Sequence, residues 1–441
     1  MTPVPDAYVA EWERAARLRQ VGDARGLTSL REEAWQRFLS LGFPTTRDEE
    51  WRFTSVAPIA ESGFSLATSL AADEGIDVAA LRLPGPLAAE LVFVNGRHVP
   101  ASSRRSALQG SRVESLADAL TSLGRGVEWP VGRVAPMQRH PFVTLNTAFL
   151  DDGAYVELAA GTMLQDPIHL LFATSGHDSR SVMAHPRVVL VLGANSQASI
   201  VETYGGPDGQ RYFTNAVTEI ELGENAVLHH YKLQYEGADA YHVGATHVRA
   251  QRSATCTSHS ISLGGGLVRN DVVAVLDGEG VECTLNGLYI ADAQRLVDHH
   301  TTIDHARPHC GSREIYKGIL ADRARGVFNG KIIVRPDAQK TDARQTNRAL
   351  LLSEDALIHT KPQLEIFAND VKCTHGAAVG QLDDEALFYL RSRGLSDSAA
   401  RQLLIHAFAA EVLSHVPLRD VRAAVEARLQ RQLARALPAA A

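Results

Sequence analysis

Cysteine is scarce in this chain of 441 residues, and long apolar runs are absent. The cysteines are Cys256, Cys283, Cys310 and Cys373, and no two of them form a C-x-x-C pair, so we expect no disulfide framework. No stretch approaches about 18 uncharged apolar residues, so we expect no membrane span. Residues 1–19 lack the apolar core of a secretory signal. These absences predict a cytoplasmic protein with reduced thiols.

Basic residues are also fewer than acidic residues. The chain carries 44 Lys and Arg residues against 51 Asp and Glu residues, a formal net charge of −7. No face-wide basic run offsets this balance, so nothing in the sequence indicates a nucleic-acid partner. Hydrophobic residues make up 45% of the chain and charged residues 22%, which is an ordinary globular composition and excludes wholesale disorder.

Common nucleotide-binding and hydrolase motifs are missing. Gly330-Lys331 has neither the upstream Gly nor the following Ser or Thr of a Walker A loop, so we expect no ATP hydrolysis by this chain. There is no G-x-G-x-x-G after an expected strand and no G-x-S-x-G nucleophile elbow.

The pattern of apolar residues divides the chain into three regions, 1–135, 136–380 and 381–441. The first region is mostly helical, because apolar residues recur at three- and four-residue spacing over 8–19 and 30–41. Gly42 and Pro44 predict the end of the second helix. A short strand is expected at 91–94, followed by an Asn95-Gly96 turn.

The middle region consists of short apolar runs separated by Gly, Asn and Asp turns, with little helical periodicity. This pattern predicts many short strands, in a sandwich, a barrel or a β-solenoid. An internal repeat favours the solenoid, because an apolar residue, a small or polar turn and an alternating strand recur in that order. Copies of the repeat start at Leu192, Leu222, Leu276, Leu352 and Ile366, with Arg249 as a weaker start.

Counting seven residues on from each start predicts one stacked column of small polar or polarisable side chains. Its members would be Ser199, His229, Cys256, Cys283, His359 and Cys373. Neighbouring members of such a column lie about 5 Å apart. We therefore expect Cys256 and Cys283 on adjacent turns of the solenoid.

The last region is helical again. A short helix is expected over 383–390, ending near Gly394, and Ser396 is a suitable N-cap for the next helix. That helix carries an apolar stripe, and after Pro417 a third helix carries another. The two stripes consist of Leu403, Ala407, Phe408 and Val412, and of Leu418, Val421, Val425, Leu429 and Leu433. The stripes either pack on the body of the protein or dock another protein.

Residues 298–310 form the densest group of metal-ligand side chains. The candidates there are His300, His305, His309 and Cys310, and imidazole and thiolate suit zinc and iron. Their spacing matches no compact metal site, and it is not the helical arrangement of H-E-x-x-H. The alternative is that they line turns and strands of the solenoid, hydrogen-bonded to the backbone.

Cys373 and His375 are a more specific candidate for a metal-binding pair. Residues i and i+2 of a strand point to the same face, so thiol and imidazole would project together. A nearby His also helps to form the thiolate that binds metal or sulfide. The alternative is a Cys inside the solenoid with its His at the surface, and a protease-type Cys–His pair has no local signature to support it.

Several segments of the chain form a recognisable set of motifs, densest between about 300 and 415. They are GFPTTRDEEWRFT at 42–54, REIYKGIL at 313–320 (which follows Asp304-His305), FNGKIIV at 328–334, AQKTDARQTNRALLLS at 338–353, PQLEIFANDVKCTHG at 362–376 and FYLRSRG at 388–394. The first resembles the N-terminal signature of the family of SufB and SufD proteins, and the others resemble core motifs of that family in the same order. The run VKCTHG at 371–376 is the SufD form, and Asn347 stands in the segment where SufB is expected to carry a Cys.

This resemblance implies a mainly β protein with a right-handed parallel β-helix core and helical regions at both ends. It implies a non-catalytic scaffold for iron–sulfur cluster assembly that pairs edge to edge with a SufB-type subunit. Its C-terminal helices, with Leu403, Phe408 and Val412, would dock a SufC-type ABC ATPase. Cys373 and His375 would face iron or a nascent cluster at the junction, with His375 the first candidate for a direct ligand.

No permanently bound cofactor is expected, only transient iron or an iron–sulfur cluster, and a homodimer is expected when no partner is present. Two alternatives remain open. One is a SufB-like subunit that builds a cluster alone. The other is a β-helix carbohydrate enzyme such as a polysaccharide lyase, which the missing secretory signal disfavours.

Overall fold

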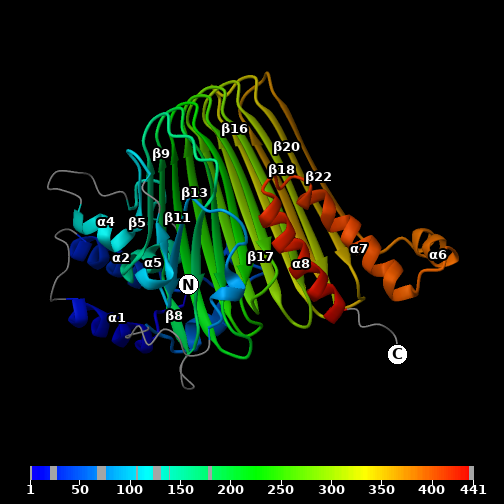
Figure 1. The fold of residues 1–441 in the computed structure, drawn as a ribbon, viewed down its shortest axis with the longest axis horizontal. Coiled ribbons are helices and arrows are strands. Elements are labelled where there is room, and N and C mark those ends of the chain that lie inside the picture. The colour runs from blue at the N-terminus through cyan, green and yellow to red at the C-terminus, as the bar shows by residue number, and fades with distance from the viewer. Residues whose placement is uncertain are drawn as a thin grey trace.

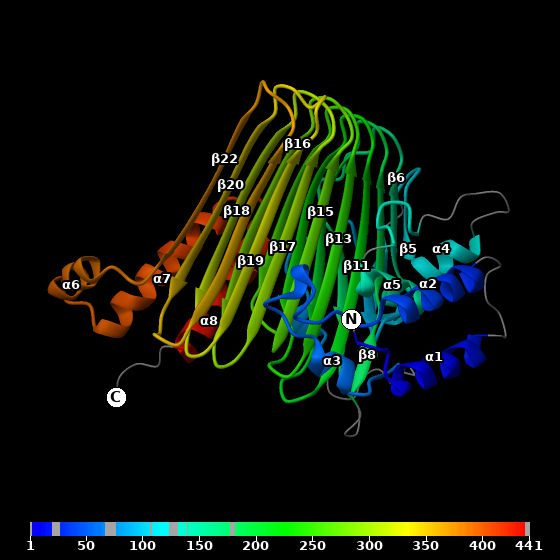
Figure 2. The ribbon, with the colours of Figure 1, turned by 180° about the vertical axis from the view of Figure 1, so that it is seen from behind.

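The middle of the chain forms a parallel β-solenoid of about seven turns, in which the backbone passes alternately through two sheets (Figure 1). This computed structural model describes residues 2–19, 27–66, 76–105, 108–122, 131–138, 140–176 and 181–436. Helices flank the solenoid at both ends (Figure 2). The predicted mainly β solenoid with helical terminal regions is confirmed.

The strands of the two sheets neighbour one another in the following order. The first sheet contains β21 (Leu357–Ile366), β19 (Arg325–Val334), β17 (Leu296–His305), β15 (Leu267–Leu276), β13 (Tyr241–Ala250), β11 (Tyr212–Leu222), β9 (Arg187–Leu192), β6 (Gly153–Leu158) and β5 (Arg112–Ser115), with β8 (Val182–Ala184) joining β11 to β1 (Ser65–Leu66). The second contains β22 (Lys372–Gly380), β20 (Asp342–Leu351), β18 (Gly311–Leu320), β16 (Glu282–Ala291), β14 (Thr255–Ser262), β12 (Val227–Tyr235), β10 (Gln197–Gly205), β7 (Ile168–Ala173), β2 (Ala89–Val94) and β3 (Arg97–His98), with β4 (Arg104–Arg105) paired to β2.

Strand register stacks equivalent residues above one another, which is why the sequence repeats. Leu192 pairs with Leu222 of the next turn, and both are buried in the interior. Asn195 and Asn225 occupy the turns that follow, with left-handed φ values of 59° and 55°. The Asn225 side-chain amide donates to the Asn195 carbonyl oxygen at 3.1 Å, so the turns are linked as well as the strands.

The predicted cysteine column is correct for its three cysteines. Cys256 pairs in register with Cys283, and that line continues through Ser312 and Ala343 to Cys373. The other proposed members lie elsewhere. Ser199 and His229 pair with each other one residue away from this line, and His359 belongs to β21 of the opposite sheet.

The N-terminal region begins as predicted with two helices and then adds short elements. The helical elements are α1 (Asp6–Arg19), α2 (Leu27–Leu41), α3 (Ala57–Glu61), α4 (Leu116–Ser122) and α5 (Pro141–Ala148), with 3₁₀ turns at Glu49–Trp51, Ala79–Leu81 and Pro100–Ser102. Gly42 follows α2 at a φ of 65°, the left-handed position that ends a helix. Asn95 and Gly96, at 50° and 81°, form the predicted turn between β2 and β3.

The N-terminal end of the solenoid is closed by short antiparallel strands. β5 pairs antiparallel with β6 in the first sheet, and β3 and β4 pair antiparallel with β2 in the second. Because β2 pairs with β7 in parallel, strands from the first 135 residues form part of the solenoid sheets. The predicted division at 1–135, 136–380 and 381–441 stays a prediction.

The C-terminal helices are α6 (Asp384–Ser392), α7 (Asp397–Leu413) and α8 (Arg419–Ala436). Helices α7 and α8 lie across the outer face of the second sheet, whereas α6 projects beyond it (Figure 1). Ser396 caps α7 as predicted, because its hydroxyl accepts a hydrogen bond from the backbone N–H of Ala399 at 3.2 Å. The predicted stripe of α8 is buried along its whole length: Val421, Val425, Leu429 and Leu433 pack against the sheet.

The buried stripe of α7 differs from the predicted one. The residues that pack on the solenoid are Ile405, Ala409, Val412 and Leu413. Of the predicted stripe, Val412 is fully buried, Phe408 is half-buried, and Ala407 and Leu403 are exposed. The helix is apolar around most of its circumference, so periodicity alone did not select the buried face. Among the described residues, none of the helices has the length and apolar character needed to cross a bilayer.

Candidate functional site at the open end of the solenoid

The C-terminal end of the solenoid is an open edge in both sheets. Within the described residues, β21 and β22 are the terminal strands, and neither has a neighbour on its outer side (Figures 1 and 2). Both are largely unburied, in contrast to the strands behind them. Four large apolar side chains are exposed along or beside this edge: Leu357, Ile366, Phe367 and Val379. The edge therefore offers unpaired backbone groups together with apolar surface.

Cys373 and His375 lie on β22, on the face that continues the interior lining. Their register partners on β20 are Ala343 and Gln345, which are both buried. Cys373 is half-buried against the apolar group around Ala343, and burial raises the pKa of its thiol above the ordinary value. His375 is exposed at the opening. Thiol and imidazole thus project from the same side of the last strand, as the sequence predicted.

A buried polar pair lies behind His375 in the same interior column. Gln345 donates from Nε2 to Glu314 Oε2 at 2.7 Å, and each of the two side chains is 1% exposed. Burial raises the pKa of Glu314 to about 7, against the opposing hydrogen bonds from Thr301 and Gln345. The column from Glu314 through Gln345 to His375 therefore leads from the interior to the open end.

The histidines and cysteine of residues 298–310 do not converge on one site. His305 points into the interior, where its Nε2 lies 2.9 Å from Ser312 Oγ, whereas His300 lies on the outer face. His309 occupies a turn with a φ of 60°, and the buried Cys310 thiol donates to the carbonyl of Gly278 at 3.2 Å. No group of three His, Cys, Asp or Glu side chains within the described ranges is arranged to hold a metal ion. These contacts fit the alternative interpretation, in which residues 298–310 line turns and strands of the solenoid.

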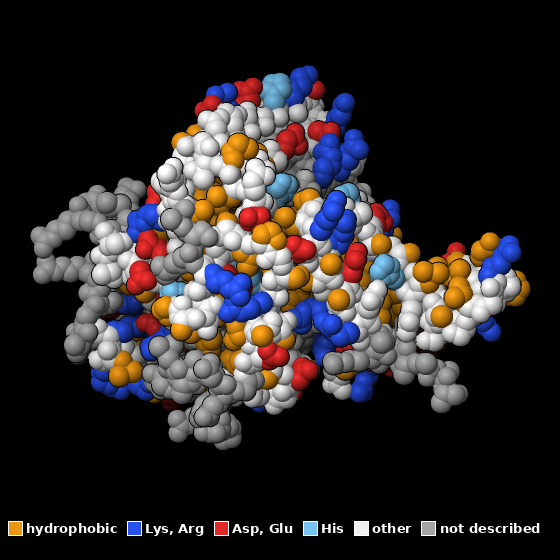
Figure 3. Space-filling view, in the orientation of Figure 1, with side chains coloured by type: hydrophobic (Ala, Val, Ile, Leu, Met, Phe, Trp, Pro, Cys, Tyr) orange, Lys and Arg blue, Asp and Glu red, His pale blue; other side chains and the backbone are white. Residues whose placement is uncertain are grey.

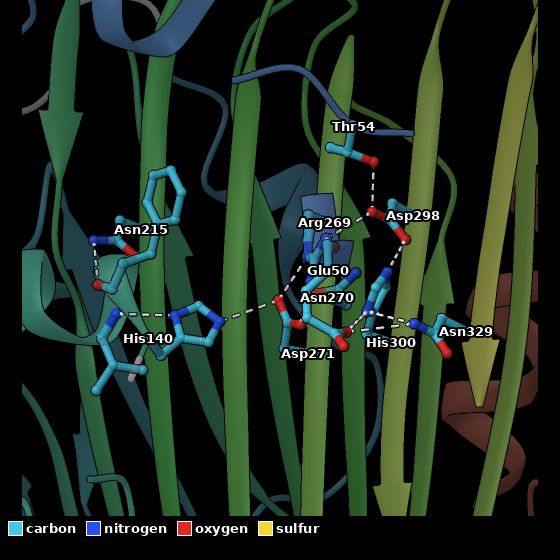
Figure 4. A network of polar contacts seen from close by, with 12 residues as sticks. Glu50, Thr54, His140, Asn215, Arg269, Asn270, Asp271, Asp298, His300 and Asn329 are labelled. Carbon is cyan, nitrogen blue, oxygen red and sulfur yellow. Dashed lines mark hydrogen bonds and ion pairs between the residues drawn. The ribbon is translucent and has the colours of Figure 1, made fainter. Parts of the chain in front are cut away.

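His300 belongs instead to a network that anchors the N-terminal segment to the first sheet (Figure 4). Arg269 is 2% exposed, and its guanidinium carbon lies 3.8 Å from the centre of the Trp51 ring. The same guanidinium donates to both oxygens of Asp271 at 2.8 and 2.9 Å and to Asp298 at 3.1 Å. It also donates to the backbone carbonyl of Glu50 at 2.5 Å. The 42–54 segment is therefore held by a buried cation.

The carboxylates of this network hold His300 in its charged form. Asp298 Oδ1 lies 3.1 Å from His300 Nε2, and Glu50 Oε2 lies 3.4 Å from His300 Nδ1. Burial disfavours the imidazolium, but the two carboxylates outweigh it and raise the pKa of His300 to about 9. Thr54 completes the anchor by donating to Asp298 at 2.5 Å. Sequence reasoning missed this site because residues 50–54 lie more than 200 residues before the residues of the first sheet that they contact.

A second exposed apolar surface lies on the projecting C-terminal helices. Phe388 and Tyr389 of α6 are 74% and 57% exposed, and Leu395 and Leu403 lie near them in sequence with exposed side chains. Figure 3 shows hydrophobic side chains gathered over this projection. Among the residues predicted to dock an ATPase, Leu403 is therefore accessible. Phe408 is half-buried beneath Lys317, whose Nζ lies 4.2 Å from the ring centre, and Val412 is inaccessible.

Two family models together match nearly the whole chain. The SufBD protein N-terminal region matches residues 4–170, and the SufBD core domain of the SUF system for FeS cluster assembly matches residues 172–408. The chain belongs to the SufBD family. The predicted resemblance is therefore confirmed, and the rival interpretation as a carbohydrate enzyme loses its support.

Named relatives of this SufBD protein include SufD proteins of two bacteria. It is 34% identical to the iron–sulfur cluster assembly protein SufD of Escherichia coli over 400 residues, which covers 90% of this chain and 91% of the relative. It is 36% identical to a SufBD family protein of Synechocystis over 419 residues, covering 90% and 89%. It is 25% identical to SufD of Bacillus subtilis over 304 residues, covering 67% and 68%.

Proposed function

We propose that this SufBD protein is a non-catalytic scaffold subunit for iron–sulfur cluster assembly, acting at the open end of its solenoid. The observation that carries the proposal is the position of Cys373 and His375. They lie together on the last strand, at an unpaired edge, where a side chain can reach a group held by a second protein. The inner three cysteines are buried and cannot do so.

The proposed partner at this edge is a SufB-type subunit with a matching open solenoid end. Strand addition satisfies the unpaired N–H and C=O groups of β21 and β22, and the exposed apolar residues beside them become buried. A second copy of this chain offers the same edge. We therefore expect a homodimer when no SufB-type partner is present, and a heterodimer when one is.

The proposed site for a SufC-type ATPase is the exposed surface of α6 and the start of α7. Phe388, Tyr389 and Leu403 supply aromatic and aliphatic anchors of the kind that dominate protein interfaces. The chain itself has no Walker A loop, so any ATP hydrolysis in the assembly comes from the partner.

Iron or a nascent cluster is the proposed cargo at the junction, held transiently and not as a resident cofactor. His375 offers an imidazole at the opening, and Cys373 offers a thiol beside it. Because burial raises the pKa of the Cys373 thiol, the thiolate needs metal or a partner's positive charge to form. His375 is therefore the better first ligand, and Cys373 follows once iron is bound.

Co-expression with SufB-type and SufC-type partners tests this proposal, with affinity purification through this chain. We expect the wild type to retain both partners and iron, and His375→Ala to retain both partners but lose the iron. The double variant Phe388→Asp/Leu403→Glu should lose only the ATPase. Met163→Asp, at another exposed apolar residue remote in sequence from both sites, is the matched control. Retention of iron by His375→Ala, or failure of the wild type to retain either partner, contradicts the proposal.

Surface substitutions are preferable to removal of the C-terminal helices. α7 and α8 bury apolar residues of the outer sheet face, including Tyr231, Leu233, Ile261 and Leu288. A truncation after α6 would expose that surface and destabilise the chain, so a lost partner would have two explanations.

A further inference from the structure

Gln345 occupies the position directly behind His375 in the interior column. The two residues are register partners on β20 and β22, and their side chains project from the same face of the second sheet. Gln345 is 1% exposed, and its Oε1 has no hydrogen-bond partner among the described residues. A buried amide oxygen without a partner is costly, on the order of 1–3 kcal/mol, and it can accept a hydrogen bond from a neighbouring donor.

The orientation of the Gln345 amide is fixed from two sides. Its Nε2 donates a hydrogen bond to Glu314 Oε2 at 2.7 Å, so Oε1 is the amide atom that can still accept one. Across the interior, a Cβ added at Gly330 would lie 2.2 Å from Gln345 Nε2, so the amide packs directly against the Gly330 backbone of the first sheet. The register partner of Gln345 on the last strand is His375, whose imidazole is the nearest candidate donor for the free oxygen.

We propose that Gln345 is a positioning residue for His375, through a hydrogen bond that it accepts from one ring N–H of the imidazole. A histidine that binds a metal commonly donates its other ring N–H to a carbonyl or carboxylate, which fixes the tautomer and the ring orientation. With one nitrogen turned inward to Gln345, the other faces the junction as the iron ligand. Glu314 supports the arrangement by holding the far end of the amide. This inference rests on the proposed function of His375.

Asn347 provides a matched control in the same strand. It is also 1% exposed, donates from Nδ2 to Thr360 Oγ1 at 2.9 Å, and has an Oδ1 without a partner in the described ranges. Its register partner on β22 is Ala377, which cannot bind a metal. Loss of the Asn347 amide removes an equally buried polar group without a candidate ligand in front of it.

The test is an anaerobic titration of the co-purified complex with Fe²⁺ alone, comparing Gln345→Met, Gln345→Glu and Asn347→Leu with the wild type. We expect Gln345→Met to weaken binding by about 10- to 100-fold, the usual effect of removing such a partner. Gln345→Glu keeps an acceptor oxygen but loses the N–H donor to Glu314, so its loss should be smaller than that of Gln345→Met. Asn347→Leu should bind within a few-fold of the wild type. Equal affinity for Gln345→Met and the wild type, or equal losses in Gln345→Met and Asn347→Leu, overturns the inference.

Two further variants keep the result decisive. If Gln345→Met does not fold, Gln345→Asn keeps a buried amide but withdraws the oxygen by one methylene, and it should show the same loss. His375→Ala separates the inference from the proposed function. If His375→Ala binds Fe²⁺ as the wild type does, the proposed function fails, whereas a loss there without a loss in Gln345→Met defeats the positioning role alone. Gln345→Met should add nothing when combined with His375→Ala.

Discussion

The thiols of Cys256 and Cys283 project from register partners on adjacent strands, β14 and β16, into the interior of the solenoid. Each residue is 1% exposed. Burial raises the pKa of the Cys256 thiol to about 12 and that of the Cys283 thiol above its ordinary value as well. The two sulfurs are therefore neutral, packed side chains at physiological pH, whereas Cys373 reaches the open end of the same column.

Thiol labelling of the native protein should distinguish these cysteines. We expect a maleimide or iodoacetamide to modify Cys373 alone at neutral pH, slowly because burial also raises its pKa, since the other three side chains are inaccessible. Mass spectrometry of peptides before and after unfolding provides the measurement. Cys373→Ser should abolish native labelling, and rapid native modification of Cys256 would contradict the described interior.

Replacement of Glu314 by Gln should stabilise the protein increasingly as the pH rises. The folded pKa of about 7 lies above the ordinary value of 4.5, so the native state binds the proton more tightly than the unfolded chain. The wild type therefore loses stability as the pH rises from about 4.5 through 7. Relative to the wild type, Glu314→Gln should gain up to about 3 kcal/mol of unfolding free energy across this window. Urea unfolding at pH 5 and pH 8.5 measures it, and a constant difference would contradict the shift.

The charged form of His300 should stabilise the N-terminal anchor, because the pKa of His300 is also raised above its ordinary value. The pKa is raised from 6.5 to about 9, so the contribution is fully present below about 6.5 and is lost as the pH rises through 9. We expect the wild type to lose on the order of 3 kcal/mol relative to His300→Gln between pH 6.5 and 9.5. Trp51 fluorescence during urea unfolding is a suitable probe. Parallel pH profiles for the two proteins would refute this account.

Replacement of Arg269 by Met should be more damaging than any change at the surface of this network. It removes the guanidinium that pairs with the buried carboxylates of Asp271 and Asp298, and it removes the contact with the Trp51 ring. Loss of one partner from a buried ion pair costs about 3–5 kcal/mol. We expect unfolding at lower urea concentration and faster proteolysis within residues 42–54. Arg52→Met, whose guanidinium lies 5.7 Å from the exposed Phe53 ring, is the control and should change stability little.

The solenoid could be predicted because stacking parallel strands makes the sequence repeat. The starts at Leu192, Leu222 and Leu276 and at Ile366 all fall in one column of the first sheet. The start at Leu352 does not, because it follows β20 of the second sheet, so counting from it led to His359 on the opposite side. Each turn of the solenoid contributes one strand to each sheet, and the turns after both strands have similar sequences. The sequence pattern alone therefore does not show to which sheet a repeat start belongs.

Contacts between residues far apart in the chain could not be predicted from the sequence. Asp298 and His300 looked like metal ligands because nothing near them in the chain shows that residues 50–54 cover them. The buried face of α7 was misassigned for a related reason, since the apolar surface that it packs on, including Leu288 and Ile319, comes from strands far away in the chain. The Cys373–His375 pair, in contrast, needed only the alternation of a strand.

The unequal ends of the solenoid determine how far an assembly can grow. A rod with a full-length strand edge at each end could add copies without limit and form a filament. Here the N-terminal end finishes in antiparallel strands of two to four residues, with Arg97, Arg104 and Arg112 along them, whereas β21 and β22 at the other end have ten and nine residues. Under the proposed pairing, strand addition would occupy the long edge in a single step. We therefore expect an assembly formed in this way to stop at two solenoids.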